Sequence, residues 1–294
     1  AAYENWRLHD EKIPNNDRRR SPFTLDKYPG EVILGRDRVE QCGDGILFYH
    51  RNPGTNTLVE MLIKQQGLEA LKGQIMDDLR NRTFGGLLIG NGFKPGGVFE
   101  GKYQTLPFRS WNLVSEEASE THHLRIVTHI AQTETQAVWQ QGLQGLVNAS
   151  INDREEAFKE TLAWWTTFWN RSWVVINPEK PDPADIAWRA GRNYNIFRYQ
   201  FGCNAFGEYP TKFNGGNFTF DANLVGDSDK PFGPDWRDWG GGVFTAQNQR
   251  LLYWPMLKSA DTENAIFSQF ELYRKALPGA QARVRTNFVH DGAV

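Results

Sequence analysis

The chain has 294 residues and a formal net charge of −2, which is room for one large domain or two ordinary ones. The near-neutral charge excludes the basic footprint of a nucleic-acid-binding protein, and no segment approaches the ~20 apolar residues of a membrane span. Eleven Trp, nine Tyr and nineteen Phe are compatible with sugar binding, because apolar sugar faces stack on rings, although most Trp in any protein are core residues.

Residues 20 to about 140 have the pattern of a β-rich domain. Leu124, Ile126 and Thr128 share one face of the run HLRIVTHI, which is the period of two of a strand. Many short strands with Gly-rich turns favour an antiparallel β-sandwich over βαβ units. The runs that we interpret as strands are EVILG, GILFYH, TLVEMLIK, GGLLIG, FRSWNLVS, HLRIVTHIA and TQAVW.

The period becomes helical after residue 150. Asp153 and Glu156 have the spacing of a capping box, and a Pro-containing connector at 177–183 precedes a second helix, for which Asp182 is the expected N-cap. The stretch FTAQNQRLLYWP predicts a third helix, and a fourth begins at Asp261. The expected apolar stripes of the first, second and fourth helices are Phe158, Leu162, Trp165 and Trp169; Ile186, Ala190, Tyr194, Phe197 and Phe201; and Ile266, Phe270, Tyr273 and Leu277.

We therefore expect an α+β multidomain protein with a β-sandwich over 1–150, a helical linker over 151–180 and a helical domain over 181–294. A polar, aromatic loop of nearly forty residues lies between the second and third helices, and a loop of that length with that composition favours a binding surface. Carboxylates lie in or next to such loops at Glu208, Asp221, Asp238 and Asp291. Neither the two cysteines nor the pair His122-His123 has metal-ligand spacing, so no metal or cofactor is expected.

The third predicted helix carries a polar run against large aromatics. Gln247, Arg250 and Trp254 recur at i, i+3 and i+7, with Asn248 beside them, while Leu251 and Leu252 are expected to be buried. Such amides and a guanidinium suit sugar hydroxyls or a water held by a carboxylate. In the alternative, the amides only tie down the neighbouring loop through backbone hydrogen bonds.

Three long motifs carry a resemblance that covers almost the whole chain. They are FWNRSWVVI, YNIFRYQFGCNAFGEYPTKFNGGNFTFD and DWRDWGGGVFTAQNQRLLYWPMLKSAD. Together they resemble six-hairpin glycosidase-like proteins that carry the DUF5703 domain, and NRTFGGLLIGNGF is similar to the β-sandwich of the same proteins. The order of domains is more distantly similar to the α-L-fucosidases of glycoside hydrolase family 95.

The resemblance implies that residues 181–294 form the first part of an incomplete (α/α)6 barrel and that the catalytic carboxylates lie mostly beyond Val294. The chain is then an N-terminal fragment that is inactive alone. Asn248 coincides with one of two asparagines that precede Tyr-Trp-Pro in the fucosidases and help hold the catalytic base and water, whereas the other falls on Ala246. Further residues that the resemblance places in the substrate pocket are Lys212, Asn214 and Asp291, the last of them not as the acid.

We thus expect the N-terminal part of an inverting glycoside hydrolase that acts on an oligo- or polysaccharide. Asn248 positions the water or base, Gln247 and Arg250 contact hydroxyls, and Trp239 or Trp254 stacks on the sugar. The alternatives are a non-catalytic carbohydrate-binding or structural protein and a polysaccharide lyase with Tyr253 as base. The expected location is secreted or periplasmic; the chain itself begins AAYENW, without the features of a signal peptide.

Overall fold

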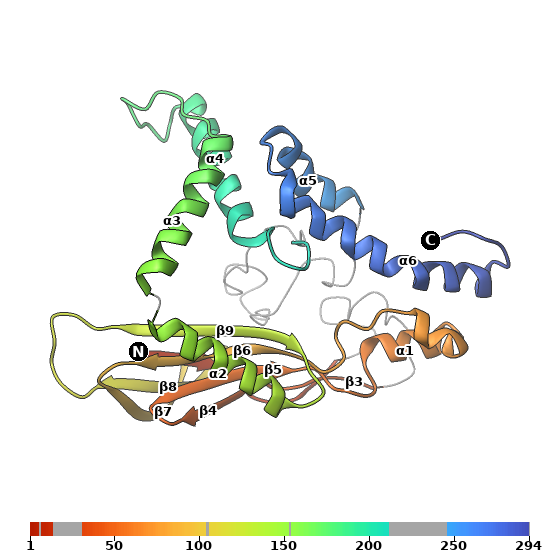
Figure 1. The fold of residues 1–294 in the computed structure, drawn as a ribbon, viewed down its shortest axis with the longest axis horizontal. Coiled ribbons are helices and arrows are strands. Elements are labelled where there is room, and N and C mark those ends of the chain that lie inside the picture. Colours follow the sequence, from red (N-terminus) through yellow and green to blue (C-terminus); the bar gives the residue numbers. More distant parts are fainter. Residues whose placement is uncertain (6, 14–30, 104–105, 153, 212–245, 294) are drawn as a thin grey trace. The chain divides into compact units, whose positions relative to one another are not determined.

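In a computed structural model, the structure describes residues 1–5, 7–13, 31–103, 106–152, 154–211 and 246–293. These residues form two compact units, a β unit that spans Ala1–Arg154 and a helical unit that begins at Glu155 (Figure 1). The protein is thus of mixed α+β class, with antiparallel sheets in its N-terminal part and helices after them. Among the helices in the described ranges, none is both long and apolar enough to span a membrane.

Nine strands in the described part of the β unit form three antiparallel sheets. The four-stranded sheet has the order β4-β5-β6-β9, the three-stranded sheet has the order β1-β8-β7, and β2 pairs with β3. The strands are β1 (Ala2–Asn5), β2 (Glu11–Ile13), β3 (Val32–Leu34), β4 (Arg38–Cys42), β5 (Gly45–Arg51), β6 (Arg82–Gly90), β7 (Phe93–Tyr103), β8 (Leu106–Ser115) and β9 (Leu124–Gln132).

The four-stranded sheet contributes to a core on each of its faces. Ile46 and Leu88 on one face pack with Phe93 and Leu113 of the three-stranded sheet, as in a β-sandwich. On the other face Leu47, Leu87 and Val127 pack against the helix α2 (Gln136–Asn152), which lies across this sheet in Figure 1. The alternation of apolar side chains along β5 and β6 therefore fills two cores, one on each face.

Two of the runs interpreted as strands are helical instead. TLVEMLIK forms α1 (Leu58–Gln65), because Thr57 and Glu60 make a complete capping box at its start. TQAVW opens α2, where Trp139, Leu143 and Val147 recur at i, i+4 and i+8 and are all buried. A short 3₁₀ segment, η2 (Glu69–Gln74), follows α1. A brief apolar run does not by itself distinguish a strand from a buried helix, and in both cases the flanking cap or the longer period decides.

The helical unit contains α3 (Arg154–Arg171), α4 (Ile186–Asn204), α5 (Ala246–Lys258), the π-helical turn η5 (Thr262–Ile266) and α6 (Phe267–Asn287). The cap predicted for the second helix was wrong: α4 begins after Asp185, whose carboxylate accepts from the N–H of Ala187. Asp182 instead accepts from the N–H of Ala184 and closes the turn before the helix. The expected cap at Asp153 lies outside the described residues.

The predicted apolar stripes are only partly buried. In α3, Phe158 and Leu162 are exposed, whereas Phe168 is buried. In α4, Ile186 is 74% exposed and Phe201 is buried, while along α6 the side chains of Phe270, Tyr273 and Leu277 are exposed. In α5, Leu252 is buried as expected, but Leu251 is 59% exposed. Helical spacing thus identified the helices, but the buried direction of each is set by contacts between helices that lie far apart in the chain.

Candidate functional site

A buried ion pair organises the helical unit. Arg198 of α4 and Asp261, which precedes η5, are each only 3% exposed, and their Nη2 and Oδ2 atoms lie 2.7 Å apart. The second carboxylate oxygen accepts from the same Nη2 at 2.9 Å and from Nε of Arg171 at 2.8 Å. Ser259 donates its hydroxyl to Asp261 at 2.5 Å. Asp261 is therefore the anchor of this cluster, and its side chain does not cap a helix.

The guanidinium of Arg198 also binds the end of α3. It donates to the backbone oxygens of Ser172 and Phe168, and its Cζ atom lies 4.2 Å from the centroid of the Phe168 ring. Since a buried charge must be both paired and hydrogen-bonded, this set of partners explains how the unit tolerates it. The cluster joins α3, α4 and the turn after α5.

A second set of contacts holds α5 in place. Gln249 is buried and donates its amide both to the backbone oxygen of Thr211, at 3.0 Å, and to the side chain of Gln269, at 2.9 Å. The hydroxyl of Tyr253 accepts from the N–H of Thr211 at 2.8 Å. Burial raises the pKa of this Tyr253 hydroxyl above its usual range. For Gln249, the side chain thus has the loop-tethering role that was the alternative interpretation of the polar run.

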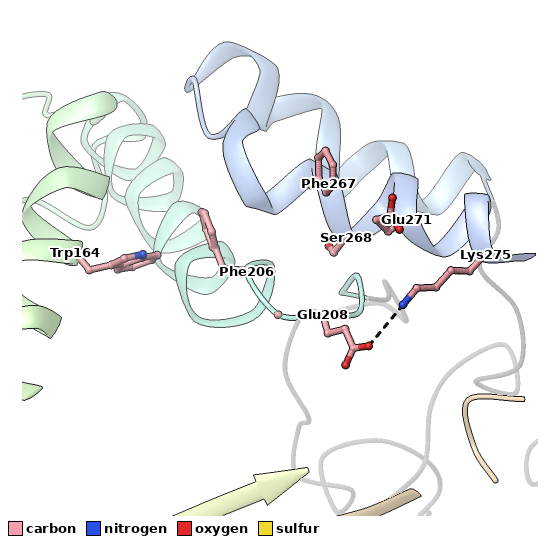
Figure 2. Close-up of a pocket in the computed structure, with 8 residues that line it drawn as sticks. Trp164, Phe206, Glu208, Phe267, Ser268, Glu271 and Lys275 are labelled. Atoms are coloured by element: carbon pink, nitrogen blue, oxygen red, sulfur yellow. Dashed lines mark ion pairs between the residues drawn. The ribbon is translucent and has the colours of Figure 1, made fainter. Parts of the chain in front are cut away.

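A hollow of about 450 Å³ lies between these anchored segments, and Figure 2 shows the side chains around it. Trp164 comes from α3, Phe206 to Glu208 follow α4, and the remaining wall belongs to the first turns of α6. The residues that line the hollow are Trp164, Phe206, Gly207, Glu208, Phe267, Ser268, Glu271 and Lys275.

One side of the hollow is aromatic. The rings of Trp164 and Phe206 meet edge to face with their centroids 5.2 Å apart, and Trp164 stacks on Phe168 at 5.3 Å. Trp164 remains 38% exposed. Packing from behind therefore fixes the Trp164 ring while part of its surface stays open to the hollow.

The other side of the hollow is charged. Lys275 Nζ lies 3.6 Å from Glu208 Oε1, and Figure 2 shows this pair across the segments that follow α4 and begin α6. Glu271, four residues before Lys275, receives hydrogen bonds from Arg274, which hold the pKa of its carboxyl below the usual value. Ser268, Glu271 and Lys275 recur at i, i+3 and i+7, so one face of α6 presents a hydroxyl, a carboxylate and an ammonium group.

Of the carboxylates predicted from sequence, Glu208 lines the hollow, and Asp221 and Asp238 lie outside the described residues. The other predicted residues lie elsewhere or are also outside the described part. Arg250 stacks on Trp254, with Cζ 5.2 Å from the ring centroid, and both side chains are exposed on α5. Asp291 is exposed and pairs with Arg285 at 3.2 Å. Neither this pair nor the Arg250–Trp254 stack lines the hollow. Gln247 and Asn248 belong to α5, but their side chains lie outside the described residues, as do Lys212, Asn214 and Trp239.

Seven of the eight residues that line the hollow were not among the sequence candidates: Trp164, Phe206, Gly207, Phe267, Ser268, Glu271 and Lys275. The spacing of Ser268, Glu271 and Lys275 was visible in the sequence, but it is common on solvated helices and acquires meaning only beside the segment that follows α4. Within the described residues, no group of three or more His, Cys, Asp or Glu side chains has the arrangement to hold a metal ion. Cys42 and Cys203 are both free thiols.

Comparison with known proteins identifies the family through the first part of the chain. The model of a domain of unknown function, DUF5703, matches residues 1–174, which is more than half of the 294 residues. This match includes the whole β unit and α3. No curated protein and no solved structure matches the chain. The chain belongs to the DUF5703 family.

Proposed function

We propose that the helical unit binds carbohydrate in the hollow between Trp164 and Lys275, and that the chain is the N-terminal part of a glycoside hydrolase. The observation that carries the proposal is the juxtaposition of an aromatic wall with two carboxylates and a lysine around one space. Sugars need this combination, because their ring faces are apolar and their edges carry hydroxyl groups that both donate and accept.

Each wall has a separate task in this proposal. The open part of Trp164, with the edge of Phe206 beside it, stacks on the apolar face of a sugar ring. Glu208 and Glu271 accept hydrogen bonds from hydroxyls, and Lys275 donates to them. Because Arg274 keeps Glu271 ionised, Glu271 suits an acceptor or a base but not a general acid, which needs a raised pKa.

The charge of the hollow favours a neutral sugar. Glu208 already pairs with Lys275 and Glu271 with Arg274, so a uronate would have to compete with a carboxylate for either cation. The buried hydroxyl of Tyr253, which already accepts from the Thr211 N–H, is also poorly placed to act as the base of a polysaccharide lyase. These two observations support hydrolysis or binding of neutral glycans over elimination on uronic polymers.

The same proposal includes the fold of the complete helical domain, the course of the reaction and the location of the protein. The helices after residue 180 are the first of an (α/α)6 barrel like that of six-hairpin glycosidases and family 95 fucosidases, and the exposed apolar faces of α3 and α6 are of the kind that neighbouring barrel helices cover. Hydrolysis proceeds with inversion, with Asn248 positioning the water or base. The protein acts on carbohydrate in a secreted or periplasmic location.

The test has a binding arm and a catalytic arm. Calorimetric titration of this chain with neutral oligosaccharides and with oligouronates should give heat with the neutral series only. The complete gene product should release free sugar from neutral glycosides, with the product anomer inverted when followed by NMR. Binding without hydrolysis would favour a non-catalytic carbohydrate-binding protein, and absorbance gained on uronic polymers would favour a lyase. If neither sugar class binds, the proposal is wrong.

A further inference from the structure

The edge strands of the β unit differ in how well they are protected. An open edge offers unpaired N–H and C=O groups, and proteins usually protect it with charges, Pro, bulges or short length. β7 has Lys94, Pro95 and Lys102, with a register irregularity between Pro95 and Val98. β4 carries Arg38 and Glu40, and β1 has four residues. β9 closes the four-stranded sheet among the described strands and has none of these devices except a single charged residue, Arg125.

β9 is also long and regular. It pairs with β6 over nine residues, from Arg82↔Gln132 to Gly90↔Leu124, without a register shift. A straight strand with continuous pairing on one side presents an equally regular row of backbone groups on the other side. The outer edge of β9 is therefore a template for a further strand.

One face of β9 is apolar and exposed. Leu88 and Ile126 are direct cross-strand neighbours and share a face, yet Leu88 is 5% exposed and Ile126 is 65% exposed. On this face the three-stranded sheet therefore covers Ile46 of β5 and Leu88 of β6 but leaves β9 exposed. There lies an apolar row, which we name the β9 row: Phe84 at the start of β6 and Leu124, Ile126 and Ile130 of β9, exposed by 46%, 45%, 65% and 58%.

We propose that a second copy of the chain covers this row, by antiparallel pairing of the two β9 strands about a two-fold axis at Thr128. In that register Ile126 of each copy lies opposite Ile130 of the other, and the two Thr128 side chains lie opposite each other. β-Branched pairs and Thr–Thr pairs are both favourable across strands. The two four-stranded sheets become one sheet of eight strands, with α2 of each copy on the opposite face.

The charges of β9 favour this register, and the small area limits the strength of the dimer. Arg125 lies opposite Ala131 of the second copy, so no like charges meet, whereas a two-fold axis at Val127 would place Arg125 opposite His129. Two nine-residue edges and four partly exposed side chains per copy bury less than the ~1,200 Å² at which stable interfaces begin. The dimer is therefore weak and forms only at high protein concentration.

Sedimentation velocity of the whole chain over a range of concentrations tests the association. The expected result is a monomer that converts to a dimer as the protein concentration rises. Ile126→Lys should weaken the dimer by at least about tenfold, because it places a charge in the apolar contact. Val98→Lys is the matched control, since Val98 is also β-branched and is 56% exposed on the protected edge strand β7, and it should leave the association unchanged.

A cross-link tests the register independently of the stability of either variant. With Cys42 and Cys203 replaced by Ser, Thr128→Cys should form a disulfide dimer under mild oxidation, because residues on the axis have Cα atoms about 4.5–5.5 Å apart. Leu124→Cys, about 27 Å from its counterpart in that register, should not. A monomer at every concentration, a dimer unaffected by Ile126→Lys, or equal cross-linking at both positions would overturn the proposal.

Discussion

Arg198 and Asp261 are separated by 63 residues, and each is 3% exposed, yet the guanidinium Nη2 contacts both carboxylate oxygens, at 2.7 and 2.9 Å. The two walls of the hollow continue directly from this pair. Phe206 and Glu208 follow the helix that carries Arg198, and the helix that carries Glu271 and Lys275 begins six residues after Asp261. The ion pair therefore sets the spacing between the walls.

Replacing Arg198 by Met should be strongly destabilising. It leaves the Asp261 carboxylate buried with Arg171 and Ser259 as its remaining partners, and breaking such a pair costs about 3–5 kcal/mol in the free energy of unfolding. Urea denaturation followed by tryptophan fluorescence measures this. The control Arg274→Met removes an exposed i,i+3 pair and should leave the transition midpoint unchanged within error. Equal effects of the two substitutions would refute the anchoring role.

The Arg198–Asp261 pair could not be predicted from the sequence. Asp261 precedes an apolar period, which predicts a helix cap, and nothing local indicates that its true partner lies on α4. The spacing of Ser268, Glu271 and Lys275 could be read in the sequence, but Trp164 and Phe206 join them only through tertiary packing. Conversely, the strands at GILFYH, GGLLIG and HLRIVTHIA were correctly predicted, because short apolar runs next to glycine and the alternation in HLRIVTHIA are local properties.

Gln249→Leu should destabilise the attachment of α5 by about 1–3 kcal/mol, because Gln269 and the Thr211 carbonyl each lose a donor. The double variant Gln249→Leu, Gln269→Leu should cost less than the sum of the single variants, since it leaves no unpaired amide between the helices. A double-mutant cycle by denaturant unfolding measures the difference. Strict additivity would show that the two amides do not act as a pair.

Two glycines of α2 provide a matched test of how this helix packs on its sheet. A Cβ added at Gly142 would lie 2.7 Å from Nε2 of His129, whose ring stacks on Trp139, so Gly142→Ala should cost about 1–2 kcal/mol. At Gly145 nothing lies within 4 Å, and Gly145→Ala should stabilise the helix by about 0.5–1 kcal/mol. Thermal unfolding should therefore shift in opposite directions for the two variants. A shift in the same direction would contradict the described contact between α2 and β9.

The capping box of α1 should show a measurable pH dependence. The hydrogen bond from Lys72 lowers the pKa of Glu60 in the folded protein. A lowered folded pKa means that the stabilisation is present above the ordinary pKa of the carboxyl and is lost as the pH falls through the lowered value. Carboxyl chemical shifts during an NMR titration should show this pKa and its rise in Lys72→Met. An unchanged Glu60 titration in that variant would rule out the assigned cause.

Localised binding of a neutral oligosaccharide tests the central claim most directly. Calorimetric titration should detect binding to the unaltered chain, and Trp164→Ala or Glu208→Gln should weaken it at least about tenfold, which corresponds to roughly 1.4 kcal/mol. Trp254→Ala, which removes an exposed ring outside the hollow, should bind as the unaltered chain does. Undiminished binding by Trp164→Ala and Glu208→Gln, each shown to be folded, together with loss of binding by Trp254→Ala, would contradict the account and move the sugar site to α5.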